Sequence, residues 1–158
     1  MVRNDHFGLS ARAPLISREI LMKKSVFSIL PLLTACAGEI PQNIGIQSGR
    51  LAACPDSPNC VSSFEADETH GIEPLAATLS EIEQILLGLN QANIVDAGKN
   101  YLYAEFTSTI MGYVDDVEFL YDAASSVTHV RSASRLGYSD MGANRKRIEA
   151  IRNALSSN

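Results

Sequence analysis

Four side chains in the middle of this 158-residue chain are of the types that acid–base chemistry or metal binding would require. They are Glu105, Asp116, Glu118 and His129. Paired carboxylates can exchange protons with a substrate, and carboxylates beside an imidazole can hold a divalent cation. The alternative is a solvated face of a sheet, which needs the same residue types. We favour this alternative, so we assign no catalytic residue, metal or cofactor.

Arginines are concentrated near the last predicted helix, and the candidates for anion binding are Arg131, Arg135 and Arg145. Helix N-termini attract anions, and guanidinium groups bind phosphates and carboxylates in a bidentate manner. A phosphate, a carboxylate or a lipid head group would suit such a place. The alternative, which we favour, is that the arginines pair with neighbouring acids such as Asp116 and Asp140 and hold the turn. Asp140, at the helix start, would repel an anion.

Two cysteines, Cys54 and Cys60, flank a short segment that contains two prolines. In an oxidising compartment the pair predicts a structural disulfide. Two thiolates without a further ligand make only half of a zinc site, and no helix N-terminus is predicted beside them to activate a thiol. A redox-active pair is the weaker alternative.

The segment from Met22 to Cys36 has the features of a lipoprotein signal. Lys23 and Lys24 precede a short apolar run, and Leu33-Thr-Ala-Cys36 resembles the site cut by lipoprotein signal peptidase. The apolar run is far below the roughly 20 residues that a membrane-spanning helix needs. We therefore expect cleavage before Cys36, with acyl chains on that cysteine and palmitate among them.

The organisation of the remaining chain follows from this signal. Residues 1–35 form the signal region, with Met22 as the expected true start, and residues 36–50 are the lipidated cysteine and a polar tether. Residues 51–158 form one domain. Ala37, in place of an aspartate, favours the outer membrane facing the periplasm if the organism is Gram-negative.

Charge is divided unevenly along the mature chain. Residues 37–130 contain two basic and fourteen acidic side chains, whereas residues 131–158 contain six basic and two acidic ones. An acidic body argues against nucleic acid as a partner, because binding it requires net neutralisation of phosphates. The basic C-terminal end is either a local anion site or the partner of the acidic part.

Hydrophobic periodicity predicts a helix, four strands and a second helix. The expected ranges are helix 79–90, strands 93–97, 100–110, 114–121 and 127–134, and a last helix capped by Asp140. Thr78 and Glu81 form a capping-box pattern at the first helix. This order predicts a two-layer α+β fold, in which two helices cover one face of a four-stranded antiparallel sheet.

Alternation within the predicted strands assigns the two faces of the sheet. Two sets of alternating residues should lie under the helices: Leu102, Ala104, Phe106, Ser108 and Ile110 in the first, and Val117, Phe119 and Tyr121 in the second. The candidate carboxylates and His129 should point the other way. The expected hairpin registers place Glu105, Glu118 and His129 in one cross-strand row, and Thr107, Asp116 and Arg131 in the next.

Several motifs resemble one known family. They are Cys54-Pro-Asp-Ser-Pro-Asn-Cys60-Val-Ser-Ser, Tyr101-Leu-Tyr-Ala-Glu, Val114-Asp-Asp-Val-Glu-Phe, His129-Val-Arg-Ser-Ala-Ser-Arg-Leu-Gly-Tyr-Ser-Asp and Asn144-Arg-Lys-Arg. Together they resemble the domain of unknown function 1499 family, over roughly residues 51–155. The resemblance implies exported, membrane-attached or organellar proteins and implies no activity.

We therefore expect a lipid-anchored periplasmic binding module of the cell envelope. Its expected partner, besides the membrane, is an anionic small molecule, an envelope lipid or an envelope protein. The alternative function is a hydrolase or metal-dependent enzyme that uses the carboxylate and histidine face. A cleft joining those side chains would favour the enzyme, and a salt-bridged face would favour the binding module.

Overall fold

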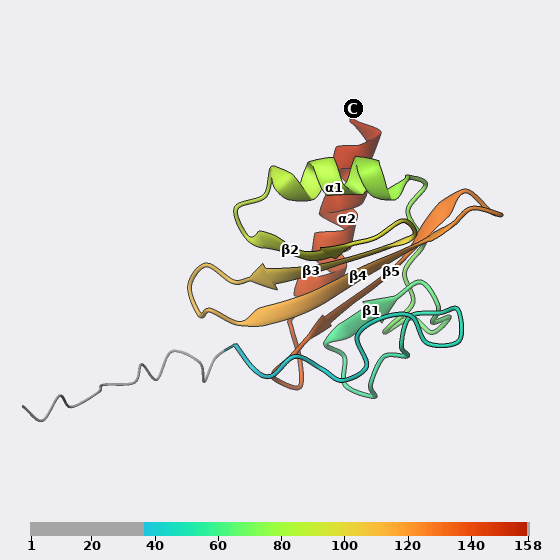
Figure 1. Ribbon diagram of the computed structural model, residues 1–158. Helices are drawn as coiled ribbons and strands as arrows, with labels where there is room; N and C mark the ends of the chain where they lie inside the picture. Colours follow the sequence, from blue (N-terminus) through green and yellow to red (C-terminus); the bar gives the residue numbers. More distant parts are fainter. Residues whose placement is uncertain (1–36, 158) are drawn as a thin grey trace, which may run out of the picture. The chain divides into compact units, whose positions relative to one another are not determined.

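The computed structural model describes residues 37–157 (Figure 1). The predicted signal region 1–35, with its expected start at Met22, and the lipidation site Cys36 lie outside the described residues. Neither helix of the described part is long and apolar enough to cross a membrane. The elements, in chain order, are β1 (Cys60–Ser62), α1 (Leu79–Leu87), β2 (Ala92–Ala97), β3 (Tyr101–Thr107), β4 (Val114–Asp122), β5 (Val127–Ser134) and α2 (Ala143–Ser156).

The sheet is antiparallel and has five strands in the order β1-β5-β4-β3-β2. The α+β class is confirmed, but the predicted number of four strands is wrong. The extra strand, β1, lies in the proline-rich stretch that was expected to be a loop or an extended cap. It is three residues long and fully buried, so it shows no alternation from which it could be recognised.

Local signals define the starts of both helices. At α1 the Thr78 hydroxyl accepts a hydrogen bond from the Glu81 N–H, and the Glu81 carboxylate accepts one from the Thr78 N–H. This capping box was predicted from the sequence. At α2 the Asp140 carboxylate accepts hydrogen bonds from the N–H groups of Gly142 and Asn144, both at 2.8 Å. Asp140 therefore satisfies N–H groups that no helical carbonyl can reach.

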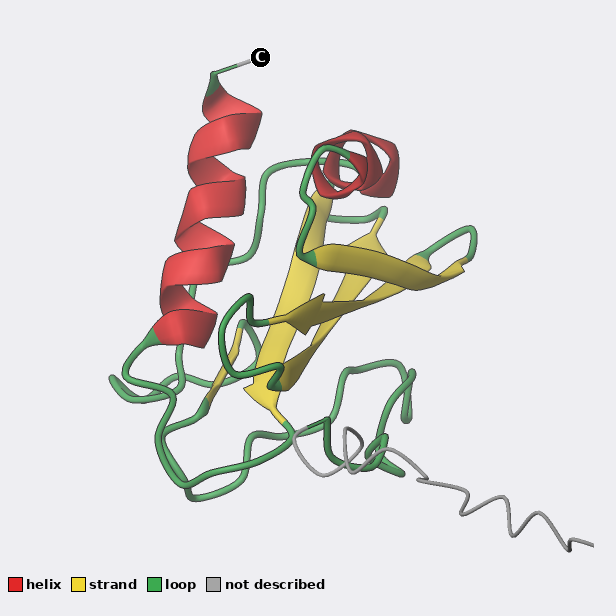
Figure 2. Ribbon diagram, turned by 90° about the vertical axis from the view of Figure 1, so that its left-hand side faces the viewer, coloured by secondary structure: helices red, strands yellow, loops and turns green. Residues whose placement is uncertain are grey.

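The hydrophobic core lies between the two helices and one face of the sheet (Figure 2). Helix α1 packs on β2 and β4, and α2 packs on β5 and β1. Five of the predicted inward-facing residues are buried: Leu102, Ala104, Phe106, Val117 and Phe119. Tyr121 is partly buried against the core. Ser108 and Ile110 are exposed, because β3 ends at Thr107. The prediction of which side chains face the helices is therefore confirmed within β3 and β4 and is wrong for Ser108 and Ile110, which lie in the loop after β3.

The predicted cross-strand rows are wrong, because each hairpin is displaced by two residues from its expected register. Glu105 pairs with Asp116 instead of Glu118, and Glu118 pairs with Arg131 instead of His129. His129 lies opposite Leu120. A displacement by two residues keeps every side chain on its predicted face but changes its neighbour.

The polar face of the sheet is covered rather than solvated. The Gly45 N–H donates a hydrogen bond of 2.7 Å to a Glu118 carboxylate oxygen, so part of the segment expected to be a tether packs on the sheet. Beside it the Arg50 guanidinium lies 4.5 Å from the centre of the Phe64 ring, and that ring stacks on His129 at 4.3 Å. Three charged side chains of this face are buried: Asp116, Glu118 and Arg131.

Candidate functional site: an ion-paired sheet face and an apolar groove

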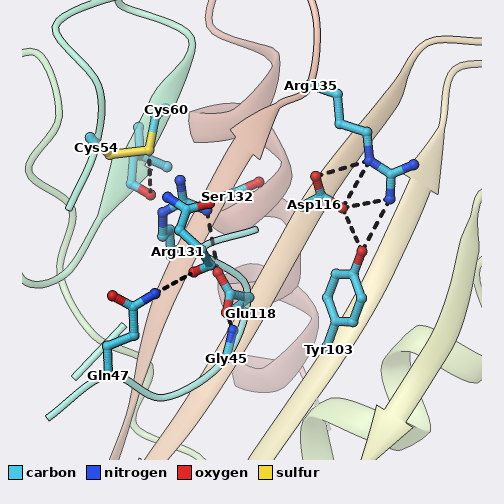
Figure 3. A network of polar contacts seen from close by, with 12 residues as sticks. Gly45, Gln47, Cys54, Cys60, Tyr103, Asp116, Glu118, Arg131, Ser132 and Arg135 are labelled. Atoms are coloured by element: carbon cyan, nitrogen blue, oxygen red, sulfur yellow. Dashed lines mark hydrogen bonds and ion pairs between the residues drawn. A yellow bond between two sulfur atoms is a disulfide. The ribbon is translucent and has the colours of Figure 1, made fainter. Parts of the chain in front are cut away.

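Glu118 is one of two fully buried candidate carboxylates (Figure 3). One of its oxygens, Oε1, accepts hydrogen bonds from the Gly45 N–H (2.7 Å) and the Tyr101 hydroxyl (2.8 Å). The other, Oε2, pairs with the Arg131 guanidinium at 3.2 Å. Arg131 is buried too, and its Nε has no hydrogen-bond partner among the described residues. Glu118 and Arg131 thus form an ion pair between β4 and β5, and both oxygens of the carboxylate accept hydrogen bonds.

A second ion-pair cluster is centred on Arg135. Its Nε donates to both oxygens of Asp116 (3.1 and 3.0 Å), and its Nη2 donates to Asp116 (2.7 Å), the Tyr103 hydroxyl (3.1 Å) and Glu105. The Tyr103 hydroxyl also donates to Asp116 at 2.6 Å. Asp116 and Glu105 therefore share one cation, which neutralises charges that adjacent strands would otherwise bring into repulsion.

These contacts change the acidity of the groups involved. Burial raises the pKa of the Tyr101 phenol well above its ordinary value of 10, and the neighbouring Glu118 carboxylate adds to the effect. Burial, together with the hydrogen bond to Asp116, likewise raises the pKa of Tyr103. Hydrogen bonds to Asp116 and Glu105 raise the pKa of Arg135. Both phenols therefore stay protonated as donors to carboxylates, and Arg135 stays charged.

The structure does not bring the four candidate acid–base residues together. Asp116 and Glu105 meet at Arg135, and Glu118 meets Arg131. His129 is separated from them, because its Nδ1 faces the Ser63 hydroxyl at 3.1 Å and its ring is stacked on Phe64. No group of three or more metal-ligating side chains is found in residues 37–157.

The three candidate anion-binding arginines do not converge on one place. Arg131 and Arg135 each face a carboxylate across the sheet. Arg145 instead donates to the backbone carbonyls of Gly71 (2.8 Å) and Thr69 (3.0 Å), and so attaches α2 to that loop. Such pairing is the arrangement expected if the arginines stabilise the fold.

Cys54 and Cys60 form a disulfide, as predicted, with their Cα atoms 5.7 Å apart. The bond lies where the chain enters β1, so it fixes the proline-rich loop against the edge of the sheet. Asn59, within the same loop, donates from its side chain to the Gly137 carbonyl at 2.7 Å. The geometry of this small loop is thus fixed both by the disulfide and by a hydrogen bond to the β5–α2 connection.

A groove of about 670 Å³ opens on the helical side of the molecule, between both helices and the loop that joins β3 to β4. Its size falls in the range of pockets that bind small molecules. Buried Phe106 and Ile151 line its inner part, and Leu89, Ile110 and Met111 line its exposed rim. Cations lie beside this apolar lining: Lys146 is exposed, and Arg147 is stacked over Phe106 at 4.7 Å.

Small side chains at three positions of α2 leave room for the groove. Ala143, Ala150 and Ala154 line it at helical spacing, and α1 ends at Leu87 instead of the expected position 90. Sequence reasoning missed this site. The available signal was the alanine stripe beside the apolar loop residues Ile110 and Met111, but the partner surface follows only from the three-dimensional packing.

The protein is thus a small two-layer α+β domain. It has buried ion pairs on the polar face of its sheet and a groove on the helical side. The chain belongs to the family described as protein of unknown function (DUF1499), whose family model matches residues 50–155. The family resemblance predicted from its motifs is thereby confirmed. No curated protein and no solved structure matches the chain.

Proposed function

We propose that this protein is a lipid-anchored binding module of the cell envelope, whose groove binds an amphiphile with an apolar chain and an anionic head. The observation that carries the proposal is the groove itself, in which an apolar lining ends beside an exposed lysine. An envelope lipid fits this description better than a small hydrophilic anion, because the arginines that could bind such an anion are already paired.

The lining supplies the two interactions that an amphiphile needs. Phe106, Ile151 and Met111 would bury an acyl chain, at about 0.8 kcal/mol for each methylene removed from water. The Lys146 ammonium has one weak hydrogen bond within the described residues, to the Met141 carbonyl at 3.4 Å, and so remains able to bind an anionic head. Arg147 is less suited to this role, because it pairs with Asp115.

Anchoring to the membrane is the second part of the proposal. Its support is the signal pattern that ends at Cys36, and the location that fits Ala37 is the outer membrane facing the periplasm of a Gram-negative cell. Cys36→Ser should release the domain from membranes or leave an uncleaved precursor. Unchanged processing and membrane partition would contradict it.

Native mass spectrometry of protein from its own host tests the groove, because a bound envelope amphiphile should appear as an added mass. Displacement of a fluorescent fatty acid then measures affinity. Affinity should rise about fourfold with each added methylene until the groove is filled. Short-chain carboxylates that bind as tightly as long-chain ones would contradict the proposal.

Two pairs of variants test separately the binding of the acyl chain and the binding of the anionic head. Ala150→Phe fills the groove and should weaken binding at least tenfold, whereas Asn153→Phe, exposed on the same helix but outside the groove, should not. Lys146→Glu should weaken binding of an anionic amphiphile about two- to fivefold, as expected for an exposed ion pair. Lys99→Glu is its control, in the β2–β3 turn.

A further inference from the structure

Two neighbouring loops at one end of the sheet expose large hydrophobic side chains. One joins β3 to β4 (residues 108–113), and the other joins β5 to α2 (residues 135–142). They are neighbours because β3, β4 and β5 pair side by side and the Arg135 N–H donates to the Val114 carbonyl. Contiguous apolar patches on a protein surface mark interaction sites. The exposed side chains are Ile110 (93%), Met111, Tyr113, Leu136, Tyr138 and Met141 (89%).

The start of the described chain lies at this same end. A Cβ on Gly38 would be 3.0 Å from the Arg135 Cβ and 3.2 Å from the Leu136 Cγ, so the backbone at Gly38 rests on the second loop. Figure 1 shows the beginning of this segment near both loops. A chain spans at most about 3.6 Å per residue, which places Cys36 within about 7 Å of Gly38. A lipid on Cys36 would therefore enter the bilayer beside the two loops.

Charge at this end is compatible with a membrane surface. Arg135 and Asp140 are the charged residues of the two loops. Arg135 is buried in its ion pairs, and Asp140 accepts hydrogen bonds from the N–H groups at the start of α2. The exposed cation nearby is Lys146, which favours an anionic lipid head group.

We propose that the loops 108–113 and 135–142 form a membrane-contacting surface, which inserts Ile110, Tyr138 and Met141 into the interfacial layer of the bilayer. The inference rests on the lipid anchor of the proposed function, because the anchor holds this end of the domain at the membrane. Apolar and aromatic side chains at the interface would then fix the orientation of the domain. That orientation turns the rim of the groove at Ile110 and Met111 toward the lipid.

The chain contains no tryptophan, so a single introduced tryptophan reports its own surroundings without background. Ile110→Trp and Met141→Trp probe the two loops, and Ala124→Trp probes the β4–β5 loop at the opposite end of the sheet. Each full-length chain is expressed in its host, and the mature lipoprotein is reconstituted in vesicles of phosphatidylcholine and phosphatidylglycerol with brominated acyl chains. We expect at least twofold quenching and a blue shift for the two loop variants, and neither for Ala124→Trp.

Vesicle-bound protein in which neither loop variant is quenched would overturn the docking inference while leaving the anchor intact. If mass spectrometry shows an unmodified Cys36, the proposed lipid anchor is wrong. The same proteins are then coupled through the Cys36 thiol to a lipid with a maleimide head group. Quenching after this coupling supports the docking surface, and its absence refutes it. A blue shift that depends on protein concentration without vesicles would mean that a second copy covers the patch, and would also refute it. Tyr138→Trp replaces any loop variant that fails to fold.

Discussion

The ion pair between Glu118 and Arg131 should show mutual rescue between two damaging substitutions. Arg131→Met leaves a buried carboxylate without its cation, and Glu118→Gln leaves a buried guanidinium without its anion. Breaking a buried pair from either side typically costs about 3–5 kcal/mol in the free energy of unfolding. A domain stable by about 5–15 kcal/mol would lose a large part of that stability in each case.

The double variant should be more stable than either single variant, for a reason visible in the geometry. Both neutral donors, the Gly45 N–H and the Tyr101 hydroxyl, bond to Oε1 of Glu118, whereas Arg131 bonds to Oε2. A glutamine can keep Oε1 and replace Oε2 with an amide nitrogen. In Arg131→Met/Glu118→Gln the buried site is therefore uncharged, and its remaining cost is an unsatisfied amide group of about 1–3 kcal/mol.

Urea unfolding of the oxidised proteins, followed by circular dichroism, measures the free energy of unfolding of the wild type, the two single variants and the double variant. These four values form a double-mutant cycle. Glu149→Gln is the matched control for Glu118→Gln, because Glu149 pairs with Arg152 at the partly exposed surface, where a salt bridge contributes at most about 1 kcal/mol. Additive losses in the double variant, or a loss for Glu118→Gln no larger than for Glu149→Gln, would refute the reasoning. The first outcome would mean that the two residues are not coupled, and the second that the pair is not effectively buried.

Three further outcomes follow from the contacts. Replacing Cys54 and Cys60 with serine should lower the unfolding free energy by about 2 kcal/mol, because the closed loop is small, and thiol labelling of the unreduced native protein should modify neither cysteine. In absorbance titration at 295 nm, Tyr101 and Tyr103 should ionise above the ordinary pKa of 10. Because the folded pKa is raised, their contribution to stability is complete below about pH 10 and is lost as pH rises further. Arg135→Ala should lower the melting temperature, and phosphate should stabilise the wild type no more than chloride at equal ionic strength. A phosphate-specific rise in melting temperature that is lost in Arg135→Ala would instead support an anion-binding site.

Helices and strand faces could be predicted because they depend on local sequence. The capping box at Thr78 and Glu81 and the alternation in β3 both survive in the structure. The strand β1 could not be predicted, because a three-residue buried strand carries no periodicity and exists only through its pairing with β5. The groove was missed for a similar reason, since its walls come from elements far apart in the sequence.

The register of each hairpin depends on the length of its loop, and the loop lengths could not be derived from the sequence. The Asp122 carboxylate accepts from the Ala124 N–H and from the Ser125 hydroxyl, and this local bonding sets the turn between β4 and β5. On the other side, the Ser108 hydroxyl and carbonyl accept from Tyr113 and Gly112 respectively, and β3 ends three residues before the predicted position. These hydrogen bonds within the loops go with pairings that differ by two residues from the predicted ones in both hairpins.

This displacement decides the chemistry of the polar face. In the predicted register two glutamates and a histidine would have been adjacent, which is an arrangement suited to proton transfer or to a cation. In the observed register Glu118 meets Arg131, and Asp116 lies where Arg135 can reach it. Opposite charges in register can be enclosed as an ion pair, and the paired like charges Glu105 and Asp116 are tolerated because both bind Arg135. The pairing therefore allows residues near Gly45 to cover part of this face, and the apolar groove lies on the helical side.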